Sequence, residues 1–464
     1  MNKWSLINFM RSVADFCVVL LSFALSYYLY FKNGHSVPYS VWEFLILGAI
    51  AGLIFVIVFH SARLYERETS LLNVVETQRL FLGWVFGALL VQGVSFYSRF
   101  LDLSRLMLTD ALLISFLLLL IERSIFYRIS IALHLRGRAI RPAVIFGAGV
   151  VGKHLFKRIY HSPALGLYVL GFLDDDEKLW GSEVHIGELL KRRSCKVLGG
   201  LNSLKELRDS GELKEVFVAM PTASYARNLE VVEACKRLEL AVTVVPPTYG
   251  QFLHSLEVRD IGGIPVLREK SLQRRIFYPV FKRIFDLIIS VIAILLLSPL
   301  FMLLAVLIRL DSEGPILFRQ KRIGLNGEEF DFFKFRSMYV TANPYGLTPQ
   351  GLSDPRITKL GRFLRRSSLD ELPQFFNVIR GDMSLVGPRP EMPFIVSTYN
   401  EEQRERLKVK PGITGVWQIS AVRGEAIHAN LEYDLFYIEH QSLLLDIIIM
   451  VKTLATAIRG IGAF

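Results

Sequence analysis

Four long apolar stretches fill the first quarter of the chain and most constrain how it folds. They span residues 17–31, 44–59, 80–96 and 106–121, and each approaches the ~20 residues that a transmembrane helix needs. The chain is also 52% hydrophobic with a mean hydropathy of +0.38, which is high for a soluble protein. We therefore predict a four-helix transmembrane domain over residues 1–135, with helices buried in a soluble core as the alternative.

The basic residues around these stretches predict how the chain crosses the membrane. Most lie before the first stretch, between the second and third, or after the fourth, so both termini are expected in the cytoplasm. These residues are Lys3, Arg11, Arg63, Arg67, Arg79, Arg123, Arg128, Arg136, Arg138 and Arg141. Arg99 and Arg105 oppose this orientation but are outnumbered. No small-residue cleavage site follows the first stretch, so we expect a retained anchor.

The overall charge limits the partners that the chain is expected to have. A formal net charge of +11 is typical of a protein that lies against anionic lipid or binds anionic substrates. No basic run is interleaved with aromatic residues, so we expect no nucleic-acid partner. The three cysteines, Cys17, Cys195 and Cys235, have no metal-binding or redox spacing.

A second domain, over residues 136–265, is predicted from alternating strand and helix patterns. The strand 143–146 leads into Gly147, Gly149 and Gly152, and a second strand ends at Asp174. Glycines at this spacing let backbone N–H groups approach a pyrophosphate, and the acid lies where a ribose-binding residue is expected. With further strands at 216–220 and 241–245, the pattern predicts a Rossmann-like, parallel, doubly wound α/β domain.

The glycine pattern leaves the role of this domain open. The same turn also packs a helix against a strand in domains without a nucleotide, so Gly147, Gly149, Gly152 and Asp174 form a possible nucleotide site only. A sugar epimerase or dehydratase would need a catalytic Tyr with a Lys four positions later. The tyrosines of this domain are instead followed at that spacing by Ala164, Phe172, Leu229 and Leu253. We therefore favour a regulatory or structural role over a membrane-anchored epimerase or dehydratase.

A fifth apolar stretch, residues 282–310, carries Ser298 and Pro299 near its midpoint. Proline removes a backbone donor and breaks the helical ladder, and serine can satisfy a freed carbonyl. Basic residues flank both ends of the stretch, and a re-entrant helix would keep both ends in the cytoplasm. We predict a re-entrant helix here; a kinked transmembrane helix is the alternative.

Adjacent carboxylates at Asp370 and Glu371 follow a run of arginines at 362, 365 and 366. Such a grouping suits phosphoryl transfer, because one acid can attack phosphorus, another can hold a metal, and guanidinium groups neutralise phosphate charge. We expect the pair in the first turn of an amphipathic helix. Acids that only stabilise the helix dipole are the alternative.

Several motifs surround this pair, and together they resemble a known family. They are residues 334–338 (KFRSM), 354–356 (DPR), 381–390 (GDMSLVGPRP) and 410–415 (KPGITG). From about residue 281 onward the sequence resembles the bacterial sugar transferases, the monotopic polyprenyl-phosphate phosphoglycosyl transferases. The preceding domains resemble those of the long-form members. The resemblance implies a catalytic domain over residues 266–464, and hence a multi-domain α/β membrane protein of the bacterial inner membrane.

The resemblance also implies a reaction. A sugar-1-phosphate would move from a UDP-sugar to undecaprenyl phosphate with release of UMP, beginning exopolysaccharide, capsule or O-antigen synthesis. Asp370 would be the nucleophile that forms a covalent phosphosugar intermediate, and Glu371 would hold Mg²⁺. A helix beginning near Ser367 or Ser368 would direct free N–H groups at the phosphates. Glucose is the first expectation for the sugar, galactose the second and an N-acetylated sugar the third.

The resemblance suggests further site residues and partners. Lys334 and Arg336 are expected beside the catalytic acids. The expected substrate-binding residues are Arg356, Arg365, Arg366, Asp382, Pro388, Arg389 and Pro390. The expected partners are the UDP-sugar, undecaprenyl phosphate, inner-membrane lipids, downstream glycosyltransferases and a second copy in a homodimer. A non-catalytic scaffold of polysaccharide export is the remaining alternative.

Overall fold

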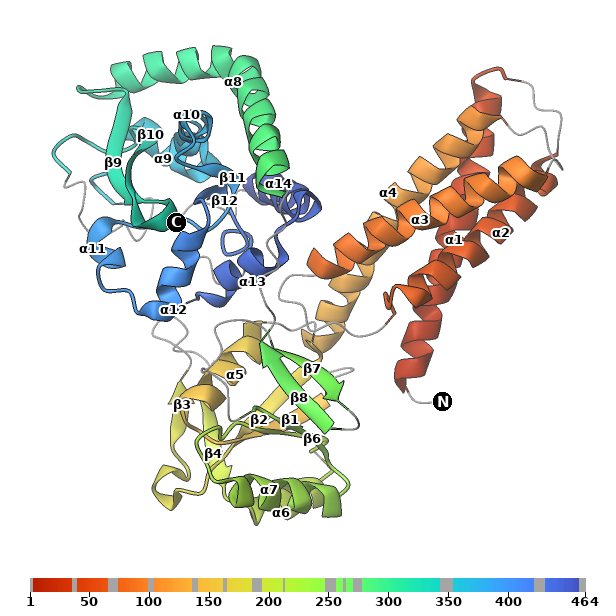
Figure 1. Cartoon of the computed structure of the whole chain (residues 1–464), viewed down its shortest axis with the longest axis vertical. Helices are drawn as coiled ribbons and strands as arrows, with labels where there is room; N and C mark the ends of the chain where they lie inside the picture. Colours follow the sequence, from red (N-terminus) through yellow and green to blue (C-terminus); the bar gives the residue numbers. More distant parts are fainter. Residues whose placement is uncertain are drawn as a thin grey trace. The chain divides into compact units, whose positions relative to one another are not determined.

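The computed structural model forms two compact units, Met1–Gln251 and Phe252–Phe464, shown in Figure 1. It describes residues 3–35, 40–65, 74–98, 104–135, 141–161, 165–185, 194–211, 213–246, 256–261, 264–269, 278–342, 354–420 and 430–458. The division between the units falls within the range predicted for the second domain. The two units are described separately.

The first unit begins with four long helices that contain the four predicted apolar stretches. They are α1 (Lys3–Lys32), α2 (Val41–Ser61), α3 (Val74–Ser98) and α4 (Arg105–Leu135). Phe23, Phe44, Phe55 and Phe59 are fully buried between them, and large aliphatic side chains such as Ile57 face outward. A bundle with apolar side chains both inside and outside suits a lipid surrounding.

Four of the described helices have the length and hydropathy of a membrane span. The spans are Asn8–Lys32, Val41–Ser61, Glu76–Phe96 and Tyr278–Asp311. The fourth predicted stretch, 106–121, lies in α4, which is not among them. Its apolar sequence is interrupted at Asp110 and bounded by Glu122 and Arg123. Arg123 pairs with the buried Asp15 of α1 at 2.6 Å, so these charges fasten α4 to α1.

The first unit continues with a six-stranded sheet, as the alternating pattern predicts. Its order is β3-β4-β2-β1-β5-β6, with β3 antiparallel to β4 and the other neighbours parallel. The strands are β1 (Arg141–Phe146), β2 (Leu167–Leu173), β3 (Glu183–His185), β4 (Ser194–Gly199), β5 (Glu215–Val218) and β6 (Ala241–Val244). The helices are α5 (Val150–His161), α6 (Ser203–Asp209) and α7 (Tyr225–Arg237), with a short 3₁₀ turn η2 (Glu177–Leu179). Apolar clusters lie on both faces of the sheet, which confirms a doubly wound arrangement.

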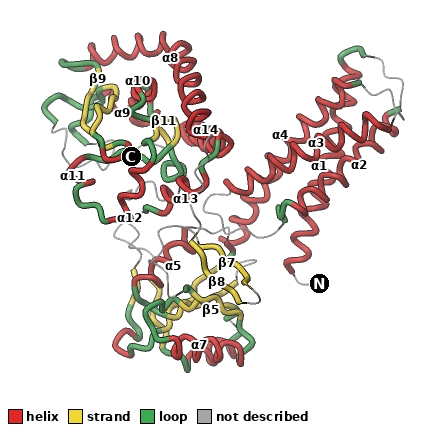
Figure 2. The backbone as a smooth tube through the Cα atoms, viewed as in Figure 1, coloured by secondary structure: helices red, strands yellow, loops and turns green. Residues whose placement is uncertain are grey.

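The second unit opens with a hairpin, β7 (Leu256–Ile261) and β8 (Ile264–Glu269), followed by the long helix α8 (Tyr278–Asp311). Two short sheets follow: β9 (Leu317–Ile323) pairs antiparallel with β10 (Glu329–Phe335), and β11 (Ser384–Val386) pairs parallel with β12 (Gly412–Thr414). Helices and 3₁₀ turns surround them, as Figure 2 shows by colour. They are η4 (Leu325–Gly327), α9 (Lys359–Ser367), η5 (Leu369–Glu371), α10 (Gln374–Arg380), α11 (Pro393–Val396), α12 (Glu401–Arg404), η6 (Glu405–Lys408), α13 (Glu432–His440) and α14 (Leu443–Ile458).

Helix α8 turns sharply partway along its length (Figure 1). Pro299 lies inside the helix, and the hydroxyl of Ser298 donates to the carbonyl of Leu295 at 2.8 Å. Leu304 and Ile308, beyond the bend, are buried against Phe335 and Leu364 of the second unit. Leu295 and Leu296, just before the bend, are 67% and 75% exposed. The bend therefore presents an uncovered apolar surface, whereas the end of the helix packs on the domain.

Candidate active site

Asp370 and Glu371 lie on a short 3₁₀ turn between two helices, not in the first turn of a helix as predicted. Helix α9 ends at Ser367, and Ser368 adopts a left-handed conformation with φ 56° and ψ 18°. Pro373 follows, and α10 begins only at Gln374. Because Ser368 reverses the backbone, a single helix cannot run through the pair. The free N–H groups predicted at a helix start near Ser367 or Ser368 are therefore limited to those of the short 3₁₀ turn that begins at Leu369.

Glu371 is held between two cations from distant segments. Lys334 Nζ, on β10, donates to Glu371 Oε1 at 2.7 Å, and the Arg389 guanidinium donates to the same oxygen at 3.0 Å. Burial raises the pKa of Glu371, but the charges and hydrogen bonds of Arg389 and Lys334 outweigh burial and bring that pKa below its usual range. Glu371 is therefore a carboxylate at neutral pH.

Asp370 has a different environment although it is the neighbouring residue. Its side chain is 9% exposed, and its Oδ2 lies 3.7 Å from Lys334 Nζ. Burial raises the pKa of Asp370, and Glu371 raises it further; Lys334, Arg365 and Arg389 only partly offset both effects. A carboxylate with a raised pKa has more basic oxygen atoms and is a better nucleophile. Asp370 is therefore suited to attack phosphorus, and Glu371 to bind a cation.

The arginines predicted to bind substrate lie in different places. Arg365 is half-buried and donates to the Ser337 hydroxyl at 3.0 Å, close enough for its charge to act on Asp370. Arg356 forms a 2.7 Å ion pair with Asp354 in its own loop. Arg366 follows Arg365 on α9, and its side chain is exposed. The structure therefore brings Arg365, but not Arg366, beside the acids.

Arg336 lies apart from the acids, although it was predicted among the catalytic residues. It is 5% exposed, and its guanidinium donates to the carbonyls of Ile308, Ser312 and Glu313 at the end of α8. Carbonyls at the end of a helix lack the N–H donors of a following turn, although the Ile308 carbonyl also accepts a 3.4 Å bond from the Ser312 N–H. Asp382 is also turned elsewhere, because its carboxylate accepts a 3.2 Å bond from Asn377 in the middle of α10.

Close backbone contact between the paired strands β11 and β12 positions Arg389. A Cβ on Gly387 would lie 2.4 Å from the Lys410 carbonyl oxygen, and a Cβ on Gly412 would lie 2.1 Å from the Gly387 nitrogen. Only glycine fits at these two positions. Gly387 leads directly to Pro388, Arg389 and Pro390, and the two prolines are buried. The predicted motif is therefore a rigid arm that carries Arg389 to Glu371.

A second buried ion network supports the same arm. Arg406 is 3% exposed; it pairs with Glu391 at 2.9 Å and Asp434 at 2.8 Å and donates to the Arg389 carbonyl at 2.9 Å. Arg406 and Glu391 border a small hollow together with Pro388, Arg389 and Pro390. Sequence reasoning missed Arg406 and Glu391, because nothing local links residues fifteen positions apart.

The carboxylates fit a magnesium ion that binds together with a substrate. In the described part of the chain, both contacts of the Glu371 carboxylate go to Oε1, which leaves Oε2 for a metal. Among the described residues no group of three or more His, Cys, Asp or Glu side chains could hold a metal alone. Mg²⁺ commonly binds one or two carboxylates and completes its shell with water and substrate phosphates, so the residues present suit that mode.

The glycine turn of the first unit is brought together with Asp174, as the pattern predicts. Asp174 Oδ2 accepts a 2.7 Å bond from the Ala148 N–H. Gly147 has φ +110°, and a Cβ on Gly152 would lie 1.9 Å from the Gly147 carbonyl oxygen, so packing explains both glycines. A Cβ on Gly149 would meet only open space. Binding of a nucleotide at this turn stays a prediction.

Comparison with known proteins was made once this geometry was defined. The family model described as "Bacterial sugar transferase" matches residues 277–460. The UDP-glucose:undecaprenyl-phosphate glucose-1-phosphate transferase of Xanthomonas campestris pv. campestris is 35% identical over 71% of this chain and 69% of the relative. The chain belongs to the bacterial sugar transferase family.

Other relatives either match a larger share of the chain or are named for a sugar other than glucose. A protein of Klebsiella pneumoniae with the same name as the Xanthomonas enzyme is 29% identical over 97% of this chain and 95% of its own length. The undecaprenyl-phosphate galactose phosphotransferase of Salmonella typhimurium is 29% identical over 70% of this chain and 69% of its own. Relatives within the family therefore carry at least two sugar names.

A second family model matches part of the first unit. A model described as "CoA-binding domain" matches residues 60–246. Among solved structures, the UDP-D-quinovosamine 4-dehydrogenase of Vibrio fischeri is 22% identical, covering 29% of this bacterial sugar transferase and 96% of that chain, with a TM-score of 0.20.

Proposed function

We propose that this chain transfers glucose-1-phosphate from UDP-glucose to undecaprenyl phosphate with release of UMP. The observation that carries the proposal is the Asp370–Glu371 pair set among Lys334, Arg365 and Arg389. Membership of the family and the names of the relatives from Xanthomonas and Klebsiella support glucose. The Salmonella relative makes galactose-1-phosphate the second candidate.

Asp370 is the nucleophile in this proposal. A carboxylate oxygen of Asp370 attacks the phosphorus that bears the sugar, the bond from that phosphorus to the bridging oxygen breaks, and UMP leaves with the electron pair. The sugar phosphate is then bound to Asp370 as an acyl phosphate. A phosphate oxygen of undecaprenyl phosphate attacks the same phosphorus, releases the Asp370 carboxylate and forms the lipid-linked sugar diphosphate.

The surrounding cations make the attack possible by neutralising negative charge. A carboxylate and a diphosphate repel each other, and Lys334, Arg365 and Arg389 reduce that repulsion at the point of attack. Glu371 would hold Mg²⁺, which when bound polarises the phosphoryl oxygens. Glu371 suits this task because the same two cations, Lys334 and Arg389, keep it ionised.

The acceptor is a lipid, and helix α8 is the element suited to meet it. Tyr278 and Lys282 near its start and Ile308 near its end all contact the one catalytic domain. A straight helix of this length would extend ~50 Å and hold its ends on opposite sides of a bilayer. We therefore propose that α8 re-enters the membrane, with its exposed bend among the acyl chains and the catalytic domain in the cytoplasm.

The same proposal includes the setting of the enzyme. The protein would be multi-pass in the inner membrane, and its product would be extended by downstream glycosyltransferases in exopolysaccharide, capsule or O-antigen synthesis. A homodimer is proposed as well, because closed symmetric dimers are the commonest oligomers of single chains.

Release of UMP by the full chain in lipid nanodiscs tests the proposal. The assay contains undecaprenyl phosphate, Mg²⁺ and, in turn, UDP-glucose, UDP-galactose and an N-acetylated UDP-sugar. We expect release with UDP-glucose, dependent on the lipid and on Mg²⁺. Without the lipid, intact-mass measurement should show the protein heavier by one phosphosugar.

The matched variants are Asp370→Asn and Asp331→Asn. Asp370→Asn should abolish both the release and the mass increase, because an amide is a poor nucleophile. Asp331 is an exposed partner of Lys321 on the β9–β10 sheet, so Asp331→Asn should behave as the parent. UMP release that survives Asp370→Asn would exclude this mechanism, and no release from any donor by folded protein would favour the scaffold alternative.

A further inference from the structure

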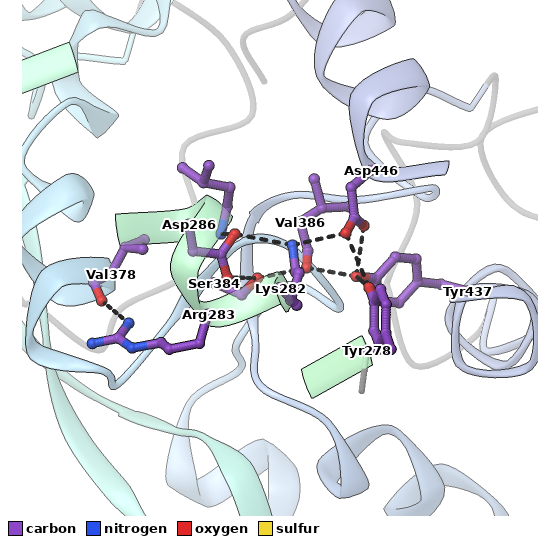
Figure 3. Close-up of polar contacts among 10 residues, drawn as sticks. Tyr278, Lys282, Arg283, Asp286, Val378, Ser384, Val386, Tyr437 and Asp446 are labelled. Carbon is purple, nitrogen blue, oxygen red and sulfur yellow. Dashed lines mark hydrogen bonds and ion pairs between the residues drawn. The ribbon is translucent and has the colours of Figure 1, made fainter. Parts of the chain in front are cut away.

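A buried polar network at the start of α8 lies outside the site described so far (Figure 3). Asp446 of α14 is its centre: Tyr278 donates to its Oδ2 at 3.0 Å, Lys282 pairs with the same oxygen at 3.1 Å, and Tyr437 lies 2.9 Å from Oδ1. Asp446 is 0% exposed. Lys282 also pairs with Asp286 at 3.0 Å, so one lysine joins two buried carboxylates.

The network is bonded directly to the strand that leads to Arg389. The Tyr437 hydroxyl lies 2.9 Å from the Val386 carbonyl oxygen, and Asp286 accepts a 2.8 Å bond from the Ser384 hydroxyl. Ser384 and Val386 are the two ends of β11. Val386 precedes Gly387, and Arg389 follows two positions later. The path therefore links α8, α13 and α14 to the strand that leads to Arg389.

The segment that carries Glu371 is fastened to the same part of α8. Arg283 donates to the carbonyls of Val378 and Ile379 at 2.6 Å and 2.9 Å, near the end of α10, and Figure 3 shows the contact with Val378. Helix α10 begins three residues after Glu371. The start of α8 therefore holds both segments whose side chains meet in the Arg389–Glu371 pair.

Packing alone does not explain buried charges at this place. Removing an aspartate and a lysine from water is unfavourable, and apolar side chains of similar volume often fill such a site at no loss of stability. Hydrogen bonds and ion pairs are directional, so they fix the position of one segment relative to another. Small displacements at a reacting centre have large kinetic effects. A fixed β11 would keep Arg389 in position for the reaction.

We propose that Tyr437 and Asp446 are positioning residues that link the seating of α8 to the Arg389–Glu371 pair. They touch neither reacting acid and act through β11 and Arg389. The position of α8 in the membrane and the position of the donor-site residues then depend on each other. The inference rests on the proposed transferase function.

Binding of UMP to the full chain in nanodiscs tests this inference without turnover. The variants are Tyr437→Phe, which removes one hydroxyl, and Asp446→Asn, which keeps the shape of the side chain. Thr456→Val is the control, because the Thr456 hydroxyl on the same helix α14 donates to the Lys452 carbonyl of its own helix. Each change is also made in an Arg389→Ala background, and the unfolding temperature of each protein is recorded.

We expect Tyr437→Phe to weaken UMP binding about three- to tenfold in the parent, with a similar effect of Asp446→Asn. In the Arg389→Ala background the further loss should be under about twofold, because the residue through which both act is gone. Thr456→Val should bind UMP as the parent does. If one of the two variants does not fold, the other serves alone.

Equal losses of affinity with and without Arg389 would overturn the inference, because the effect would then not pass through that residue. Unchanged affinity in variants with a lower unfolding temperature would overturn it as well, since the network would then be purely structural. A parent protein that binds neither UMP nor UDP-glucose would instead refute the transferase proposal, and this inference with it.

Discussion

Arg389 donates a 3.0 Å hydrogen bond to Glu371 across eighteen positions of sequence. The bond joins the segment that follows β11 to the 3₁₀ turn that carries both acids. The donor is charged, and the close contact of Gly387 with Gly412 restricts its position. This hydrogen bond therefore sets the distance between residues 387–390 and the 3₁₀ turn. It is the contact through which the proposed donor site is assembled.

Replacing Arg389 tests whether charge alone is enough at this position. Arg389→Lys keeps the charge but loses the planar fork of donors, and we expect kcat/KM for UDP-glucose to fall by about tenfold, since a charged hydrogen bond contributes ~1.5–3 kcal/mol. Arg389→Ala should reduce it by about 10²- to 10³-fold. UMP-release kinetics measure both, with Arg404→Lys on the exposed helix α12 as the control. Equal activity of Arg389→Lys and the parent would contradict the prediction.

Arg336 should matter for stability more than for donor binding. Its guanidinium donates to three carbonyls at the end of α8, and Arg336→Met should lower the free energy of unfolding by about 2 kcal/mol because the Ser312 and Glu313 carbonyls lose this donor. Denaturant unfolding measures the loss. The KM for UDP-glucose should stay within about twofold of the parent value. A large rise in KM at unchanged stability would place Arg336 in the substrate site instead.

Ser368 is expected to be a strained residue that glycine can replace. Its left-handed φ of 56° costs a non-glycine residue ~1–2 kcal/mol, and its side chain makes no capping hydrogen bond. Ser368→Gly should therefore raise the unfolding free energy by about 1 kcal/mol. Ser368→Val should lower it and reduce kcat, because a β-branched residue favours a backbone that displaces Asp370. A stabilising effect of valine would show that the turn is not strained.

The Arg406 network should make stability depend on pH. Burial raises the pKa of Asp434 from 3.8 to about 6, against the opposing charge of Arg406. The folded state then holds a proton at pH values where the unfolded state has lost it. This contribution to stability is complete below pH ~4 and is lost as the pH rises through about 6. Unfolding midpoints across this range should show a decline in the parent that is absent in Asp434→Asn; the same slope in both proteins would assign the decline to another group.

The proposed re-entry of α8 predicts the accessibility of its two ends. Phe281 and Leu310 are 57% and 78% exposed near the start and end of the helix. In a background without the three native cysteines, Phe281→Cys and Leu310→Cys should both react with a membrane-impermeant thiol reagent in inside-out vesicles, and neither in intact spheroplasts. Labelling of the two positions from opposite sides would show that α8 crosses the membrane.

The elements that local sequence determines were predicted well. Apolar runs long enough to span a bilayer recur in α1, α2 and α3, and the strands around residues 143–146 and 216–220 appear in the parallel sheet. These patterns depend on neighbouring residues only. The break at Pro299 was also visible, because proline acts on its own helix.

Features that depend on distant contacts were not visible in the sequence. The pair at Asp370 was expected on a helix, because nothing local shows that Ser368 would turn left-handed. Arg336 was placed among catalytic residues by its motif, whereas its direction is set by the end of α8. Arg406, Tyr437 and Asp446 gave no local signal, because their partners lie on other elements.

The close backbone contact between β11 and β12 limits how such enzymes can diversify. Gly387 and Gly412 touch backbone to backbone, so a larger residue at either position would push β11 and β12 apart and move Arg389. These two positions therefore leave little room for substitutions that adjust the place of Arg389. If the proposed function holds, a change of sugar preference is expected from side chains elsewhere in the site, with this glycine contact kept.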